Sequence, residues 1–197
     1  MQTSHVISDL ILGLIGLFVF FRYLLKLPLM ETVLWESFVL SVSFAALFGA
    51  AKFAGFEQAG YVSSFFQNLA ATVGALALAV VSWFKVWEDD TLDNVIGYMV
   101  LGVGFLIFLI HQTIGIPNLI NHIPVVAMIL VALAAIRGLM KGQTQLGIWL
   151  LMAVLFAAAA TFRNSYVSNP ENAIDVYHYL MAASLICFGM AAAKPSV

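Results

Sequence analysis

The chain has 197 residues, of which 63% are hydrophobic and 9% are charged, and its formal net charge is −2. A soluble globular protein carries roughly a quarter charged residues, so this composition leaves too little polar surface for a protein in water. The small net charge also argues against a nucleic-acid partner. We therefore expect membrane lipids to be the main partner.

Apolar runs, separated by short stretches with Gly, Pro, Asn or charged residues, divide the chain into seven predicted spans. In chain order they cover residues 5–25, 32–53, 62–83, 92–114, 120–139, 144–162 and 174–192. Each run is close to the ~20 apolar residues that a helix needs to cross a bilayer, and backbone amides in lipid must bond within their own segment. The sequence therefore predicts an all-α, seven-helix transmembrane bundle that forms one integral membrane domain over residues 1–197.

The distribution of basic residues predicts the orientation of the bundle. An odd number of spans places the two termini on opposite sides of the membrane. The side with the C-terminus holds Arg22, Lys26, Lys85, Arg137, Lys141 and Lys194, whereas the side with the N-terminus holds Lys52 and Arg163. Basic residues collect on the cytoplasmic side, so we expect a cytoplasmic C-terminus and an extracytoplasmic N-terminus in a bacterial-type inner membrane. The first residues lack the basic region of a secretory signal, so we expect the first span to be retained.

All four histidines fall on the side of the N-terminus, and two aspartates accompany them. His5 and Asp9 are four residues apart, and Asp175 and His178 are three apart, so each pair lies on one helix face. Imidazole and carboxylate groups together bind Zn²⁺, Fe or Mn. The sequence therefore predicts a metal site built from Asp175, His178, His5, Asp9, His111 and His122.

Other interpretations of these residues remain open at the level of sequence. Ionisable groups inside a span are costly and point to function, but the cost falls near the span ends, where water reaches them. In this second interpretation the four histidines are separate residues at the membrane interface, and Asp175 interacts with the amides at the N-terminus of the last helix. A third interpretation is a haem carrier with His111 and His178 as axial ligands.

The last span opens with the string Asn172-Ala173-Ile174-Asp175-Val176-Tyr177-His178-Tyr179. This acid–histidine motif, the seven spans and the short loops resemble the CREST superfamily, which includes alkaline ceramidases and progestin/adipoQ receptors. The resemblance implies a zinc-dependent amide hydrolase that acts on lipids. Ser41 matches the serine that the superfamily carries in its second span. The chain departs from the pattern in having no histidine in that span, Gln67 and Asn68 in place of the third-span aspartate, and Ala182 where the last span carries a second histidine.

Two functional hypotheses follow. The first is a metal-dependent hydrolase of lipid-like substrates, with zinc as the metal that lowers the pKa of a bound water. The second is a non-catalytic membrane protein: a small transporter, a sensor, or an accessory subunit that buries one face against a partner subunit or a second copy of the chain.

Overall fold

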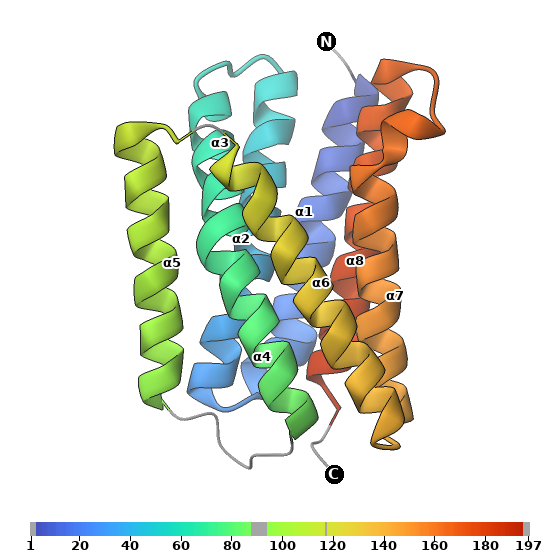
Figure 1. The fold of residues 1–197 in the computed structure, drawn as a ribbon. Coiled ribbons are helices and arrows are strands. Elements are labelled where there is room, and N and C mark those ends of the chain that lie inside the picture. Colours follow the sequence, from blue (N-terminus) through green and yellow to red (C-terminus); the bar gives the residue numbers. More distant parts are fainter. Residues whose placement is uncertain (1–2, 88–93, 117, 195–197) are drawn as a thin grey trace.

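The computed structural model describes residues 3–87, 94–116 and 118–194, which form helices joined by short connections (Figure 1). In chain order the elements are α1 (Thr3–Tyr23), the 3₁₀ turn η1 (Leu24–Lys26), α2 (Leu29–Phe53), α3 (Ala59–Leu69), the π-helical turn η2 (Ala70–Gly74), α4 (Ala75–Trp87), α5 (Asn94–Ile114), α6 (Leu119–Met140), α7 (Thr144–Thr161), the 3₁₀ turn η3 (Arg163–Ser165) and α8 (Pro170–Ala192).

The predicted all-α bundle is confirmed, because the described residues contain seven helices long and apolar enough to cross a membrane, and no strand. The predicted start of the fourth span, at residue 92, lies outside the described residues. The third span is one continuous rod, Ala59–Trp87, made of α3, η2 and α4. A π-helical turn widens a helix locally and is often found at functional sites. Here it lies against α2 so closely that a Cβ on Gly74 would be 2.8 Å from the Cα of Phe38.

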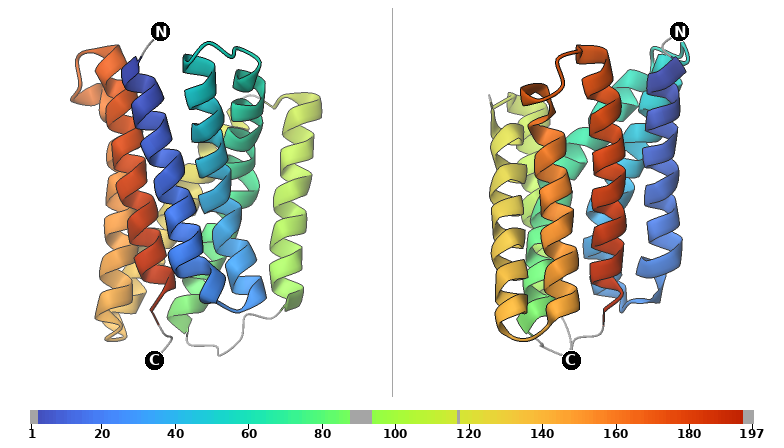
Figure 2. Two further views of the ribbon diagram at one scale, coloured as in Figure 1. Left: turned by 180° about the vertical axis from the view of Figure 1, so that it is seen from behind. Right: turned by 90° about the vertical axis from the view of Figure 1, so that its right-hand side faces the viewer.

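Six spans form a closed ring around the axis of the bundle. α1 packs between α2 and α8, α8 packs on α7, α7 on α6, α6 on α4, and α4 on α2. α5 stands outside this ring against η2 and α4 (Figures 1 and 2). The first and last helices of the chain are therefore neighbours. The two termini lie at opposite ends of the bundle, which we call the N-terminal end and the C-terminal end (Figure 1).

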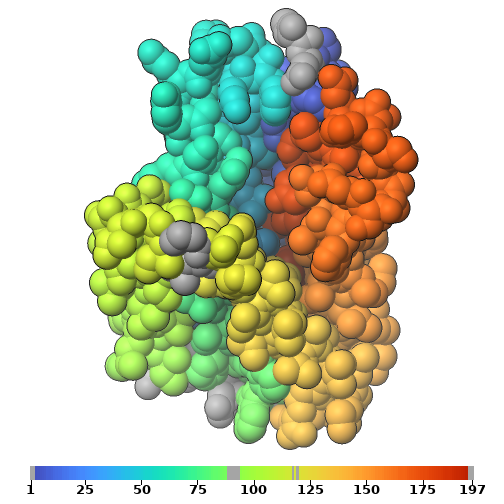
Figure 3. Space-filling view, turned by 45° about the horizontal axis from the view of Figure 1, so that its top comes forward, coloured from blue at the N-terminus to red at the C-terminus, as the bar shows by residue number. Residues whose placement is uncertain are grey.

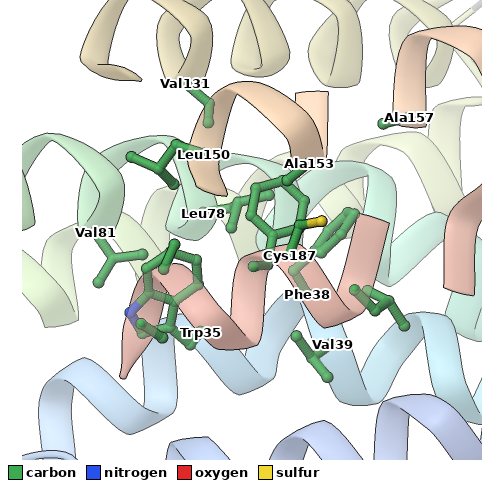
Figure 4. Packing of buried hydrophobic residues seen from close by; sticks show 14 of the residues in the cluster. Trp35, Phe38, Val39, Leu78, Val81, Val131, Leu150, Ala153, Ala157 and Cys187 are labelled. Atoms are coloured by element: carbon green, nitrogen blue, oxygen red, sulfur yellow. The ribbon is translucent and has the colours of Figure 1, made fainter. Parts of the chain in front are cut away.

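The half of the ring at the C-terminal end is filled with apolar side chains. Trp35 and Phe188 are completely buried, with ring centroids 6.2 Å apart, and Phe38 packs edge-on against Phe188 at 5.9 Å. Figure 4 shows Leu78, Val81, Val131, Leu150 and Cys187 gathered around these rings. In lipid such packing stabilises the bundle by close van der Waals contact, since lipid tails are as apolar as the side chains themselves.

The last helix begins earlier than residue 174, where the sequence placed it. α8 starts at Pro170, and the side chain of Asn169 caps it by accepting a hydrogen bond from the backbone N–H of Glu171. Proline suits the first turn of a helix because its missing N–H would be unpaired there. Asp175 consequently lies in the second turn, and the interpretation of this carboxylate as a group at the helix N-terminus is wrong.

Candidate functional site

The contact between α1 and α8 brings four of the predicted site residues together. The Nδ1 atom of His5 lies 2.7 Å from Oδ1 of Asp175, and the Nε2 atom of His178 lies 3.1 Å from Oδ1 of Asp9. Each imidazole therefore pairs with the carboxylate of the opposite helix. The spacing of three or four residues within each helix makes this exchange feasible, because both partners of a pair then face the same neighbour.

Ser8 joins the two pairs into one network. Its hydroxyl donates to Oδ1 of Asp175 at 2.7 Å and also lies 2.9 Å from Nδ1 of His178. The side chain is completely buried between α1 and α8. Sequence reasoning missed this residue, although it lies three positions after His5 and so shares the face that carries His5 and Asp9.

The network is held in place by close packing around it. His5, Asp9 and His178 are 1%, 3% and 9% exposed, so bulk water does not replace their hydrogen bonds. Gly49 of α2 leaves the space that the carboxylate of Asp9 occupies, because a Cβ on this glycine would be 2.7 Å from Oδ2 of Asp9. The ring of Phe53 covers His5 at a centroid distance of 5.0 Å. Gly49 is a second residue of the site that sequence reasoning missed, because no sequence pattern indicates that this residue of α2 faces Asp9 of α1.

The network joins its members through three hydrogen bonds and one ion-pair contact. The hydrogen bonds are those of His5 with Asp175, Ser8 with Asp175 and Ser8 with His178, and the ion-pair contact is that of His178 with Asp9. The hydroxyl of Ser8 also lies 3.2 Å from the carbonyl oxygen of His5. A hydroxyl carries one proton, so when Ser8 donates to Asp175, its hydrogen bond with His178 needs the N–H at Nδ1 of His178.

Imidazole and carboxylate groups are ligands that zinc prefers, but in this network they face one another. Both ring nitrogens of His178 face protein oxygens, and Nδ1 of His5 faces Asp175, so the ligand atoms point at one another and not at a common centre. In the part of the chain that the structure describes, no group of three or more His, Cys, Asp or Glu side chains is arranged to hold a metal ion. These residues as arranged do not fit a metal centre, and metal binding stays a prediction.

The other two histidines lie apart from the network. His111 is in the last turn of α5 and His122 in the first turn of α6, at the same end of the bundle. Among the described residues, neither histidine forms a hydrogen bond with His5, Asp9, Asp175 or His178. His122 is exposed, and Nδ1 of His111 is buried without a hydrogen-bond partner.

A cavity of about 570 Å³ lies inside the ring, in the half nearer the N-terminal end, and the network forms part of its wall. Asp9, His178 and Tyr177 line it on one side, and Ser63, Gln67 and Asn68 of α3 line it as well. Deeper in the bundle the lining is apolar, from Leu12, Phe38, Val42, Met128, Ala157 and Met181. Figure 3 shows the surface hollowed between the end of α2 with α3 and the end of α7 with α8. The volume of this cavity, and its mostly apolar lining with a few polar groups, are typical of binding sites for small molecules.

Comparison with known proteins places the chain in a family. Residues 4–196 match a family of unknown function, DUF6962, and the chain belongs to it. No curated protein and no solved structure matches the chain.

Proposed function

We propose that this member of the DUF6962 family is a membrane hydrolase that binds a lipid-like molecule in the cavity and uses the Asp9–His178 pair for acid–base catalysis. One observation carries the proposal: a carboxylate and an imidazole that lie 3.1 Å apart, Asp9 and His178, are on the wall of a cavity whose floor is apolar. General acids and bases must lie within hydrogen-bond reach of the reacting group, and a cavity wall meets this requirement.

The Asp9–His178 pair can serve as both the acceptor and the donor of the proton that moves in this hydrolysis. The basic partner takes a proton from a water molecule, whose oxygen attacks the carbonyl carbon of an ester or amide. The same proton then goes to the leaving oxygen or nitrogen as the bond from carbon breaks. Ser8 is excluded as the nucleophile because it is completely buried and does not line the cavity. Its place between Asp175 and His178 makes it a positioning residue that holds the imidazole ring.

A hydrolysis assay of the protein in nanodiscs of lipids without net charge tests the proposal. The probes are the lauroyl ester and the lauroyl amide of a fluorescent coumarin, which differ only in the bond that breaks. We expect wild-type protein to release the coumarin, and His178→Gln and Asp9→Asn to lower kcat by about 10²–10⁴-fold. Glu171→Gln, at an exposed acid four residues before Asp175 on the same helix, is the matched control and should keep full activity. Unchanged rates in the His178 and Asp9 variants would rule out this pair as the acid–base group.

The resemblance to the CREST superfamily favours the same class of reaction and implies bound zinc, which the described residues as arranged do not fit. Metal analysis of the purified protein separates the two forms of the proposal. About one equivalent of metal per chain, lost in His178→Ala and by chelation together with activity, favours the metal-dependent form. Activity that survives chelation favours the acid–base pair alone.

A non-catalytic role as a sensor or transporter is the second candidate. The observation that favours it is the closure of the network, in which each imidazole and carboxylate is already paired. Such a network suits a proton-dependent switch between two conformations. Binding of a lauroyl probe without turnover, under conditions in which the probe reaches the cavity, would favour this candidate.

We also propose that the N-terminal end of the bundle, and with it the cavity, faces away from the cytoplasm. The support is the excess of basic residues at the C-terminal end. The single native cysteine, Cys187, is buried, so single cysteines placed at residue 57 or residue 164 report the accessibility of this end to a membrane-impermeant thiol reagent. Labelling of intact cells would support the orientation, and labelling only after lysis would reverse it.

A further inference from the structure

The rim of the cavity carries the two basic residues of this end of the bundle. Lys52 is in the last turn of α2 and Arg163 is in η3, directly after α7, and both line the cavity. Neither forms an ion pair with an acidic residue among the described parts of the chain. By contrast, Lys85 at the opposite end pairs with Glu31 at 2.7 Å. The cationic groups at the cavity are therefore left for something other than the nearby carboxylates.

Arg163 is held in place without using all of its donors. Its guanidinium carbon lies 4.7 Å from the centre of the Tyr177 ring, and Nη1 donates to the carbonyl oxygen of Ala160 at 3.1 Å. Its Nε atom is buried and has no hydrogen-bond partner. An unpaired buried donor costs free energy, and a guanidinium fixed over an aromatic ring presents its remaining N–H groups in the fork that matches a carboxylate or a phosphate.

The carboxylates nearest the cavity are already engaged by imidazoles. Asp175 contacts His5 and Asp9 contacts His178, and among the described residues neither carboxylate forms an ion pair with Lys52 or Arg163. A ligand that brings a negative charge to this end of the cavity would supply the acidic partner that the two basic residues lack there.

We propose that the ligand of the cavity is an amphipathic molecule with an anionic polar end, a carboxylate or a phosphate, that is recognised by Arg163 and Lys52. Its hydrocarbon part lies along the apolar floor next to Phe38, Met128 and Met181. This inference rests on the proposed function and adds the charge of the ligand to it. Asp9 and His178 line the same cavity as Arg163 and Lys52, so one bound molecule can contact both pairs of residues.

Binding of laurate and of dodecanol, measured by native mass spectrometry from phosphatidylcholine nanodiscs, tests the inference without any mutation. The two probes share a twelve-carbon chain and differ in charge. We expect laurate to bind at least 10-fold more tightly than dodecanol, and dodecyl phosphate, as the third probe, shows which anion is preferred. Equal binding of laurate, dodecyl phosphate and dodecanol would overturn the anionic ligand while leaving the lipid-like ligand of the proposed function intact. Failure of all three to bind would overturn both.

Variants then assign the preference to residues. Arg163→Gln and Lys52→Gln should each lower laurate affinity by about 10-fold and leave dodecanol unaffected, and Arg163→Lys should recover only part of the loss because a lysine has no Nε–H fork. Arg22→Gln is the matched control, since Arg22 also lies over a tyrosine ring, at 5.8 Å from Tyr23, but at the opposite end of the bundle. If Arg163→Gln does not fold, Lys52→Gln and Arg163→Lys still decide the question. A laurate preference that persists in both variants would overturn the assignment.

Discussion

The two halves of the bundle are built from the same apolar helices but differ in packing: one is filled with side chains, and the other contains a cavity. Toward the C-terminal end, aromatic and branched side chains such as Trp35 and Phe188 fill the ring completely. Toward the N-terminal end, small residues and polar groups leave a cavity of about 570 Å³ and a buried hydrogen-bonded network. One half of the bundle is therefore closely packed, and the other half holds a cavity and a polar network.

The largest expected difference between the halves is the response to removing a large side chain. Phe188→Ala should destabilise the protein by ~3 kcal/mol, the lower end of the range for a buried phenylalanine, because in lipid the loss comes mainly from van der Waals contacts. Met128→Ala, which enlarges an existing cavity, should cost less than about 1 kcal/mol. Unfolding by SDS in mixed micelles measures both. Equal losses would show that the cavity half is packed as tightly as the core.

The network should respond as a polar unit. Asp175→Ala leaves Nδ1 of His5 and the hydroxyl of Ser8 without their shared acceptor. An unpaired buried polar group costs ~1–3 kcal/mol, and the partial exposure of Asp175 lets water replace some of the loss, so we expect about 2 kcal/mol in total. Glu171 on the same helix is exposed, so Glu171→Ala should change the unfolding free energy by less than about 0.5 kcal/mol. The same SDS titration compares them, and equal effects would argue against a cooperative network.

The space reserved for Asp9 can be tested with a single methyl group. Gly49→Ala places a Cβ 2.7 Å from Oδ2 of Asp9, so the carboxylate must shift. We expect a loss of ~1–2 kcal/mol from overpacking and a lower turnover of the lauroyl probes. Gly102→Ala adds the same methyl group where no atom lies within 4 Å. A helical glycine replaced by alanine without a clash should gain ~0.5–1 kcal/mol. A gain at both positions would contradict the tight fit around Asp9.

The smallest effect concerns hydrogen bonds of serine within the spans. Ser184 of α8 donates to the carbonyl oxygen of Ala153 on α7 at 2.8 Å, whereas Ser82 donates to Leu78 within its own helix at 2.7 Å. Bonds between helices in a membrane contribute ~0.6 kcal/mol on average, so Ser184→Ala should cost about that amount and Ser82→Ala less. Thermal unfolding in detergent, with both variants measured in parallel, is sensitive enough for the comparison. A larger loss for Ser82→Ala would reverse the assignment.

How far the sequence predicts the molecule depends on the range of the interactions involved. Hydropathy is local, so the seven spans were predictable, and the spacing of His5 with Asp9 and of Asp175 with His178 identified the helix faces that carry the network. The bridge through Ser8, the space left by Gly49 and the unpaired donor of Arg163 depend on which helices become neighbours. No local pattern encodes that arrangement. His111 and His122 share the end of the bundle with the network, but sharing an end does not bring side chains into contact.

The neighbouring placement of α1 and α8 has a consequence for the biogenesis of the protein. Half of the network enters the membrane with α1 and the other half with α8, so the site cannot assemble until α8 has been synthesised. Until then Asp9 has no partner from α8, and an ionisable group within a span is costly when it is unpaired. A chain that stops before residue 170 would have six spans, and Asp9 would lack the imidazole of His178 that it contacts in the complete bundle.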